Sequence, residues 1–245
     1  MTEQDIARGT GMALWRQIAE RLERDIVAGN RQPGERLPTE LQMAEEFGVN
    51  RHTVRRAVAA LAEQGLVRIE QGRGTFVQES VIDYRVKTRT RFSENLLGHK
   101  REPSGTFLSI REEPAEEPVA RALEIRKGTP VFVVERLGEA DGRPITIASH
   151  YFPKARFPGL PAALRELGSI TRTMERFGVG DYTRKVTRVT ARNARAADAR
   201  LLQQAPNKPI LMTEGINIDS AGRPVEYSVA RWAADRVQMV FEPGA

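Results

Sequence analysis

The sequence predicts an α+β protein with two domains, and three observations support this prediction. Apolar residues recur at helical spacing as far as residue 64, which indicates a small helical domain near the start of the chain. Short β-type runs then become frequent, and two stretches of the second half are related by an internal repeat. The chain has 245 residues, enough for two domains of ordinary size.

Composition restricts the kinds of protein that the chain can be. With 40% hydrophobic and 29% charged residues, it can build a packed core. It has no cysteine, which excludes disulfides, thiolate metal sites and cysteine nucleophiles. No apolar run approaches the ~20 residues of a membrane span, and residues 1–11 lack the apolar core of a signal peptide. We therefore expect a cytoplasmic protein with no membrane partner and no cofactor.

The first domain opens with two predicted helices. Residues 12–28 should form the first, whose apolar stripe recurs every four residues at Leu14, Ile18, Leu22 and Ile26. Gly29 and Asn30 end this helix. A second, short helix should begin after Thr39, which suits the N-cap position. Its expected inward residues are Leu41, Ala44 and Phe47.

A third helix and a hairpin complete this domain. Gly48 supplies a turn, and Asn50 can cap a helix that ends near Gly65, with a core stripe of Val54, Val58 and Leu61. Residues 66–77, LVRIEQGRGTFV, have the pattern of a small hairpin. Two short helices joined by a tight turn that contains glycine are typical of the helix-turn-helix, to which the hairpin would add a wing.

Positive charge is concentrated at the third helix and the hairpin. Residues 50–77 carry five arginines and two glutamates, whereas residues 1–49 carry six arginines and nine acidic residues. A helix that lies end-on in a DNA major groove presents its first turn to bases and phosphates, where Arg, Asn and Thr can read bases. A solvated helix face would also tolerate arginine. The ordered set of turn, capped basic helix and Gly-Arg-Gly hairpin favours DNA binding.

The stretch ERLPTELQMAEEFGVNRHTVRRAVAALAEQGLVRIEQGRGTFV resembles the winged-helix DNA-binding domain of the GntR superfamily of bacterial transcription regulators, over residues 12–78. This resemblance implies that double-stranded DNA is a partner. It also implies the following contacts: Arg36 at a phosphate, Asn50, Arg51, Thr53 and Arg55 on the recognition helix, and Gln71, Gly72 and Arg73 at the wing tip.

The boundaries of the second domain follow from periodicity and from the repeat. Residues 79–90 show no apolar periodicity and are predicted to be a linker, so the expected domains are 1–78 and 91–245. Within the second, RALEIRKGTPVFVVERLGEADGRPI and RLLQQAPNKPILMTEGINIDSAGRPV share leucine, proline, glutamate and Gly-Arg-Pro at matching separations. Each copy has the pattern helix, strand, turn, strand. Two such units would pair into one antiparallel sheet with helices against it.

Residues 91–243 resemble the effector-binding domain of the HutC subfamily of GntR regulators, which has a chorismate-lyase-like α+β fold. RTRFSENLLG, ASHYFP and VEYSVARWAADRVQMVFE look most like the regulators of phosphonate utilisation in that subfamily. The resemblance implies a small anionic or polar effector at the open face of the sheet. The implied contacts are Phe92, Ser93, Arg136, Ser169, Thr171, Glu226 and Trp232.

Each of these candidates has a structural alternative. Arg136 interrupts the apolar run VFVVERL, where an arginine must either pair with an acid or face a cavity. Ser93 and Ser169 stand at expected helix starts, which suit an anion, but each could be only a helix cap. Glu226 could pair with an arginine, and Trp232 could belong to the core.

Two further features bear on the effector. Gly138 stands where sugar-phosphate-binding members often keep a second arginine, which leaves room for a different anion. The basic residues Arg184, Lys185, Arg188 and Arg192 recur nearly every other residue, which favours the solvated face of a strand, with one of them able to reach the pocket.

The sequence thus predicts a homodimeric DNA-binding regulator and not an enzyme. We expect a repressor that a small phosphonate- or phosphate-like effector releases from a palindromic operator. A sugar phosphate or an amino-acid derivative is the alternative effector. A chorismate-lyase-like enzyme is disfavoured, because the histidines at 52, 99 and 150 lack metal-ligand spacing and no Gly-x-Ser-x-Gly motif occurs. A nucleoid protein would not need so large a second domain.

Overall fold

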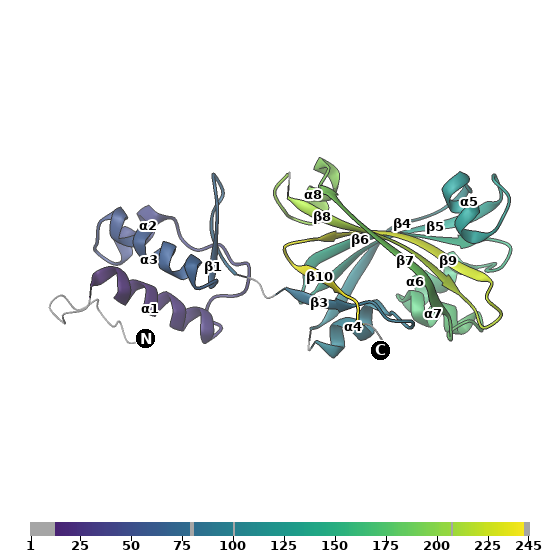
Figure 1. Cartoon of the computed structure of the whole chain (residues 1–245), viewed down its shortest axis with the longest axis horizontal. Coiled ribbons are helices and arrows are strands. Elements are labelled where there is room, and N and C mark those ends of the chain that lie inside the picture. Colours follow the sequence, from purple (N-terminus) through teal and green to yellow (C-terminus); the bar gives the residue numbers. More distant parts are fainter. Residues whose placement is uncertain (1–12, 79–80, 100, 207, 243–245) are drawn as a thin grey trace. The chain divides into compact units, whose positions relative to one another are not determined.

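The computed structural model describes residues 13–78, 81–99, 101–206 and 208–242. These residues form two compact units that divide between Ser80 and Val81 (Figure 1). The elements of the first unit are α1 (Leu14–Val27), α2 (Glu40–Glu46), α3 (Arg51–Glu63), β1 (Val67–Glu70) and β2 (Gly74–Val77). The predicted winged helix-turn-helix is confirmed, because three helices precede one antiparallel hairpin.

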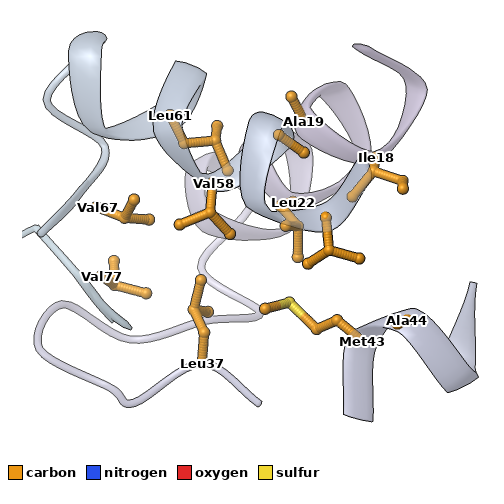
Figure 2. Close-up of a cluster of buried hydrophobic side chains, with 12 residues drawn as sticks. Ile18, Ala19, Leu22, Leu37, Met43, Ala44, Val58, Leu61, Val67 and Val77 are labelled. Carbon is orange, nitrogen blue, oxygen red and sulfur yellow. The ribbon is translucent and has the colours of Figure 1, made fainter. Parts of the chain in front are cut away.

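A single apolar core holds the first unit together. Ile18 and Leu22 of α1 pack against Val58 and Leu61 of α3, and Met43 of α2 closes the same core (Figure 2). Val67 and Val77 attach the hairpin to it. One detail of the prediction is wrong, because the Leu41 side chain is 54% exposed and Met43 is buried in its place.

Side-chain caps explain where the second and third helices begin. Thr39 Oγ1 accepts from the backbone N–H of Gln42, and the Gln42 side chain accepts from the Thr39 N–H, so the two form a capping box. Asn50 Oδ1 accepts from the backbone N–H of Thr53 at 2.8 Å. Both N-caps are therefore confirmed as the sequence predicted them.

The second unit is built on one antiparallel sheet of six strands in the order β4-β5-β6-β9-β8-β7. The unit's elements are β3 (Ile82–Arg85), α4 (Phe92–Gly98), β4 (Pro103–Pro114), α5 (Glu117–Leu123), β5 (Pro130–Ala140), β6 (Arg143–Pro153), α6 (Leu160–Leu167), α7 (Ile170–Arg176), β7 (Thr183–Asn193), α8 (Ala196–Leu201), β8 (Pro209–Ile218), β9 (Pro224–Ala233) and β10 (Val237–Val240).

The internal repeat accounts for this strand order. Each copy contributes a helix and a hairpin, α5-β5-β6 and α8-β8-β9, and a strand precedes each copy. The copies meet where β6 pairs with β9 at the centre of the sheet. Asp141 and Gly142 link β5 to β6 with φ of 51° and 73°, the left-handed pair that a two-residue hairpin turn requires.

Different elements cover the two faces of the sheet (Figure 1). One face packs against α5 and α8, with Val133 beside Leu123 and Ile147 beside Ala199 in their respective cores. The other face packs against α6 and α7 at one end, and against α4 with β3 at the other. Space remains between these two covered ends.

The predicted linker contains a strand. Residues 82–85 form β3, which pairs in parallel with β10, so that Ile82 lies opposite Val237 and Tyr84 opposite Met239. The linker prediction is therefore wrong for these residues, because Ile82 and Tyr84 are buried in the second unit. Residues 79–80 lie outside the described residues.

In the part of the chain that the structure describes, no helix is both long and apolar enough to cross a membrane.

Candidate functional sites

The first turn of α3 presents two exposed arginines that share one carboxylate. Arg55 donates to Glu40 through Nε at 3.1 Å and through Nη2 at 2.9 Å, and Arg51 Nη2 approaches the same carboxylate at 3.4 Å. The hydrogen bond from Arg55 is the main cause that lowers the pKa of Glu40. Both arginine side chains remain more than half exposed, so their guanidinium groups are oriented and still accessible.

Asn50 and Thr53 are engaged with each other at the start of the same helix. Asn50 Oδ1 accepts from both the backbone N–H and the hydroxyl of Thr53, at 2.8 and 2.9 Å. The structure thus shows a capping role for Asn50. Its contact with a base, and that of Thr53, remain predictions.

The remaining predicted DNA contacts lie in the wing or beside it. Gln71, Gly72 and Arg73 form the exposed tip, where Arg73 Nη1 pairs with Glu70 at 2.8 Å. Arg36 lies beside β2 of the wing: its backbone forms a bridge with Phe76, and a Cβ on Gly74 would come within 2.8 Å of Arg36 Nε. A side chain at position 74 would therefore shift the Arg36 guanidinium.

The second unit contains a cavity of about 400 Å³ on the face of the sheet between its covered ends, which we call the C-terminal pocket. It is large enough for a small metabolite. The seven predicted effector contacts line it, although they come from four different elements, α4, β5, α7 with its N-cap, and β9: Phe92, Ser93, Arg136, Ser169, Thr171, Glu226 and Trp232. The fold therefore brings all seven to one cavity, and their contact with a ligand remains a prediction.

Arg136 faces the C-terminal pocket and not an acidic partner. It makes no ion pair within 4.0 Å among the described residues, and its one hydrogen bond is a long one, 3.5 Å, to the Ser104 carbonyl. Its guanidinium carbon lies 5.1 Å from the centre of the Phe92 ring. Burial lowers the pKa of Arg136, yet an arginine stays protonated in proteins. Among the described residues, no acid thus pairs directly with the positive charge that Arg136 brings to the pocket.

Glu226 forms a buried polar cluster at the floor of the pocket. Its side chain is 5% exposed, and its two oxygens contact His150 Nδ1 and Asn217 Nδ2. Burial alone would raise the pKa of Glu226. The hydrogen bond and charge of His150, together with the charge of Arg184 and the hydrogen bond of Asn217, outweigh this effect and lower that pKa. The predicted alternative partner, an arginine, is replaced here by a histidine and an amide. His150 itself lines the pocket.

The two helix-start serines differ in their local roles. Ser169 is the N-cap of α7, and its hydroxyl oxygen accepts from the Arg172 N–H at 3.3 Å. Ser93 lies inside the first turn of α4, whose N-cap is Arg91. The cap alternative therefore holds for Ser169 and fails for Ser93, and both line the pocket.

Trp232 is both core and pocket wall. It is 5% exposed, and its Nε1 donates to Thr213 Oγ1 at 3.0 Å. The centre of its ring lies 4.5 Å from that of Tyr84, with the two ring planes tilted by 49°. Gly138 shapes the same wall, because a Cβ there would come within 2.8 Å of the Phe92 ring. A larger residue at 138 would displace Phe92.

Tyr84 and Arg184 are among the lining residues that sequence reasoning did not name as effector contacts. Tyr84 lay in the predicted linker, although the alternation of Ile82, Tyr84 and Val86 could have indicated a strand. Arg184 is one of the four basic residues of β7 of which one was expected to be able to reach the pocket, and no feature of the sequence distinguishes it from Arg188. Among the residues described, no cluster of histidine and acidic side chains could hold a metal ion.

Comparisons with known proteins match both units of the chain. The family model "Bacterial regulatory proteins, gntR family" matches residues 14–77, and the model "UTRA domain" matches residues 98–238. An HTH-type transcriptional regulator of Rhizobium meliloti is 42% identical over 243 residues, which cover 99% of this chain and 100% of that protein. The "Probable transcriptional regulator PhnF" of Escherichia coli is 34% identical, with 93% of this chain and 94% of that protein covered.

The fold has a solved counterpart. The crystal structure of PhnF from Mycobacterium smegmatis superposes with a TM-score of 0.64 at 24% identity, covering 93% of this chain and 99% of that one. At this identity the likeness concerns the fold. The matched domains and the full-length relatives nevertheless determine the family: the chain belongs to the GntR family of bacterial transcriptional regulators, in the subfamily that joins a winged helix-turn-helix to a UTRA domain.

Proposed function

We propose that this regulator is a homodimeric repressor, which binds a two-fold symmetric operator and leaves it when a small phosphonate- or phosphate-like anion enters the C-terminal pocket. Residues up to 78 read the DNA, and residues from 91 onward bind the effector and dimerise. The observation that carries this proposal is Arg136, whose guanidinium faces a metabolite-sized cavity without an ion pair in the described part of the chain.

An anion suits this pocket for chemical reasons. The donors of a guanidinium form a rigid fork that matches the oxygens of a phosphonate, phosphate or carboxylate. The hydroxyls of Ser93 and Thr171 line the same cavity and can donate to such oxygens. The resemblance to regulators of phosphonate utilisation, together with Gly138 in place of a second arginine, favours a phosphonate over a sugar phosphate.

We expect a dimer because the DNA-reading surface of one copy is small. One α3 offers few side chains to the bases, chiefly those of its first turn. Two copies on a symmetric site would double these contacts, as in other helix-turn-helix proteins. Sedimentation should therefore show a dimer at micromolar concentration, with one dimer per operator. A monomer that binds DNA alone would contradict this part of the proposal.

The experiment begins by finding the operator. Selection from a random DNA pool with the full chain should enrich a palindrome. Small phosphonates, phosphate esters, sugar phosphates and amino-acid derivatives are then screened by thermal shift, and each hit is added to the protein–operator complex. Release by a phosphonate or phosphate ester supports the proposal. Tighter DNA binding with the hit would overturn the repressor-release scheme, and a sugar phosphate or amino-acid hit would establish the alternative effector.

An enzymatic role has little support. Glu226 and His150 form an acid–base pair in the pocket, but both relatives named above are transcriptional regulators. We therefore propose that the pair positions a ligand.

A further inference from the structure

The C-terminal pocket has a second cationic residue, Arg184, at the corner of the sheet opposite Arg136. Arg136 lies on β5 and Arg184 on β7, which are four strand spacings apart in the sheet. Following the register, Arg136 lies level with Ala230 on β9, whereas Arg184 lies level with Glu226 on that strand. On a flat sheet these offsets correspond to about 19 Å across the strands and about 13 Å along them. The two arginines therefore enter the pocket from diagonal corners.

Arg184 is directed into the pocket and lacks a protein partner. Within the described residues its guanidinium makes no hydrogen bond or ion pair, and its buried Nε is unsatisfied. The neighbouring strand makes room for it at Gly215, where a Cβ would lie only 1.6 Å from Arg184 Nη1. A buried N–H without a partner is costly, which is why such groups deserve a functional explanation.

Glu226 is not that partner. Although its carboxylate lies near enough for the charge of Arg184 to contribute to its lowered pKa, no Arg184 nitrogen comes within 4.0 Å of it. The two Glu226 oxygens are instead occupied by His150 and Asn217. The Arg184 donors remain available to a ligand.

Between the two corners the floor of the pocket includes three small residues, Ala148, Ala230 and Ser228. They lie in two adjacent rows of the sheet, which Thr213 and His150 share. Both arginines also oppose the rise in the pKa of Tyr84 that burial causes, so both of their charges reach the same cavity. A compact single anion at Arg136 would leave the Arg184 corner unfilled.

We infer that the natural effector is an elongated molecule with an acidic group at each end, one bound at Arg136 and the other at Arg184. This inference rests on the proposed function, because it concerns the same pocket. It adds the requirement that the effector carries a second acidic group, which the proposed function does not demand. The chemical class is a phosphonate or phosphate ester that carries a second acidic group, such as a carboxylate, separated by a short carbon chain.

Matched pairs of compounds test the second acid. Phosphonoacetate, phosphonopropanoate and phosphonobutanoate carry two acidic ends, and ethyl-, propyl- and butylphosphonate replace the carboxylate of each by a methyl group. Calorimetry on the full chain should show at least one two-ended acid binding roughly tenfold or more tightly than its matched compound, as expected for charge-assisted hydrogen bonds. Equal affinity, or no binding, in every pair would overturn the inference.

Two substitutions on one strand assign the effect to Arg184. Arg184→Gln should remove the preference for the two-ended acid while leaving the affinity for the one-ended compound within about threefold of wild type. Arg188→Gln, which alters an exposed arginine of β7 outside the pocket, should keep the preference. Equal melting temperatures would show that both variants fold. A preference that survives Arg184→Gln would contradict the inference.

The outcomes separate this inference from the proposed function. If one-ended phosphonates bind as tightly as two-ended ones and still release the operator, the inference fails and the proposed function stands. If a two-ended acid binds with an Arg184-dependent preference but leaves operator binding unchanged, the inference stands and the release mechanism fails.

Discussion

At the scale of single residues, the DNA-reading face is organised before DNA arrives. Glu40 holds Arg51 and Arg55 by charge-assisted contacts, so less side-chain freedom remains to be lost on binding. Arg36 is oriented separately, by its place against Gly74 in the wing. The two kinds of arginine should therefore affect binding differently.

Substitution of Arg51 should separate base reading from phosphate binding. Arg51→Ala should cost roughly 1–3 kcal/mol on the selected operator and relax the preference at one base pair, if Arg51 makes a bidentate base contact. Arg36→Ala should weaken binding evenly on all sequences and flatten its dependence on salt. Titrations on operator and random DNA at several salt concentrations measure both effects. Identical losses on the two DNAs for both variants would refute this division of roles.

Asp219 should make the stability of the second unit sensitive to acid. Burial would raise its pKa, but hydrogen bonds from the Arg223 backbone and from Arg156 outweigh it and hold that pKa at about 2. Because the unfolded-state pKa is higher, near 4, ionised Asp219 stabilises the folded state above about pH 4, and this contribution is lost as the pH falls toward 2.

Asp219→Asn should accordingly lower the free energy of unfolding by about 2 kcal/mol at pH 7 and by about half as much near pH 3. Urea unfolding followed by Trp232 fluorescence measures this free energy of unfolding for the second unit. A Trp15→Phe background removes the other tryptophan of the chain. A loss that is the same at both pH values would show that the carboxylate charge is not responsible.

At the scale of elements, the wing depends on a glycine for two reasons. Gly74 has φ of +120°, which L side chains rarely adopt, and a Cβ there would meet Arg36. Gly65, between α3 and β1, also has a positive φ, +72°, but open space around its missing Cβ. A substitution at Gly65 therefore imposes backbone strain alone, whereas one at Gly74 imposes strain and also disturbs Arg36.

Gly74→Ala and Gly65→Ala should each destabilise the first unit by about 1 kcal/mol, because both impose strain on the backbone. Gly74→Ala alone should also weaken operator binding severalfold, since it displaces the Arg36 side chain. Thermal melts and DNA titrations on both variants measure the two effects. If Gly65→Ala weakens DNA binding as much, strain and not Arg36 is the cause.

At the scale of the whole molecule, control requires that ligand and DNA prefer different states. A ligand with equal affinity for the DNA-bound and free forms would shift nothing. A roughly hundredfold loss of operator affinity needs a coupling free energy of about 2.7 kcal/mol, which is within the usual range for allosteric proteins. The β3 strand, which follows the DNA-binding unit in the chain and brings Tyr84 to the pocket, is well placed to respond to a ligand.

Linkage supplies a test of this coupling. Bound operator should weaken effector affinity by the same factor by which effector weakens operator affinity. Arg136→Ala should abolish the response to the effector while leaving operator binding without ligand nearly intact. Calorimetry on wild type and variant, with and without operator, decides both points. If the variant binds the effector as tightly as wild type, the anion site lies elsewhere.

Local signals in the sequence determined the elements of this protein. Some elements depend only on residues close together in the sequence, so their positions could be predicted. Examples are the apolar stripe of α1, the caps Thr39 and Asn50, and the Asp141-Gly142 turn. The repeat predicted the two hairpins of the sheet for the same reason. Resemblance to a family then indicated which residues would face a pocket, and all seven line one cavity.

Only the tertiary structure decided how distant segments complete the pocket. Residues 82–85 carry a short apolar alternation, but their place in the second unit depends on pairing with β10 far along the chain. Arg184 enters the pocket while Arg188 stays exposed, because a register shift between Arg184 and Val186 changes which residues of β7 face the cavity. The contacts of Glu226 with His150 and Asn217 depend likewise on the pairing of β6, β9 and β8. Side-chain direction in a sheet follows from register with neighbouring strands, and that information is not local to the sequence.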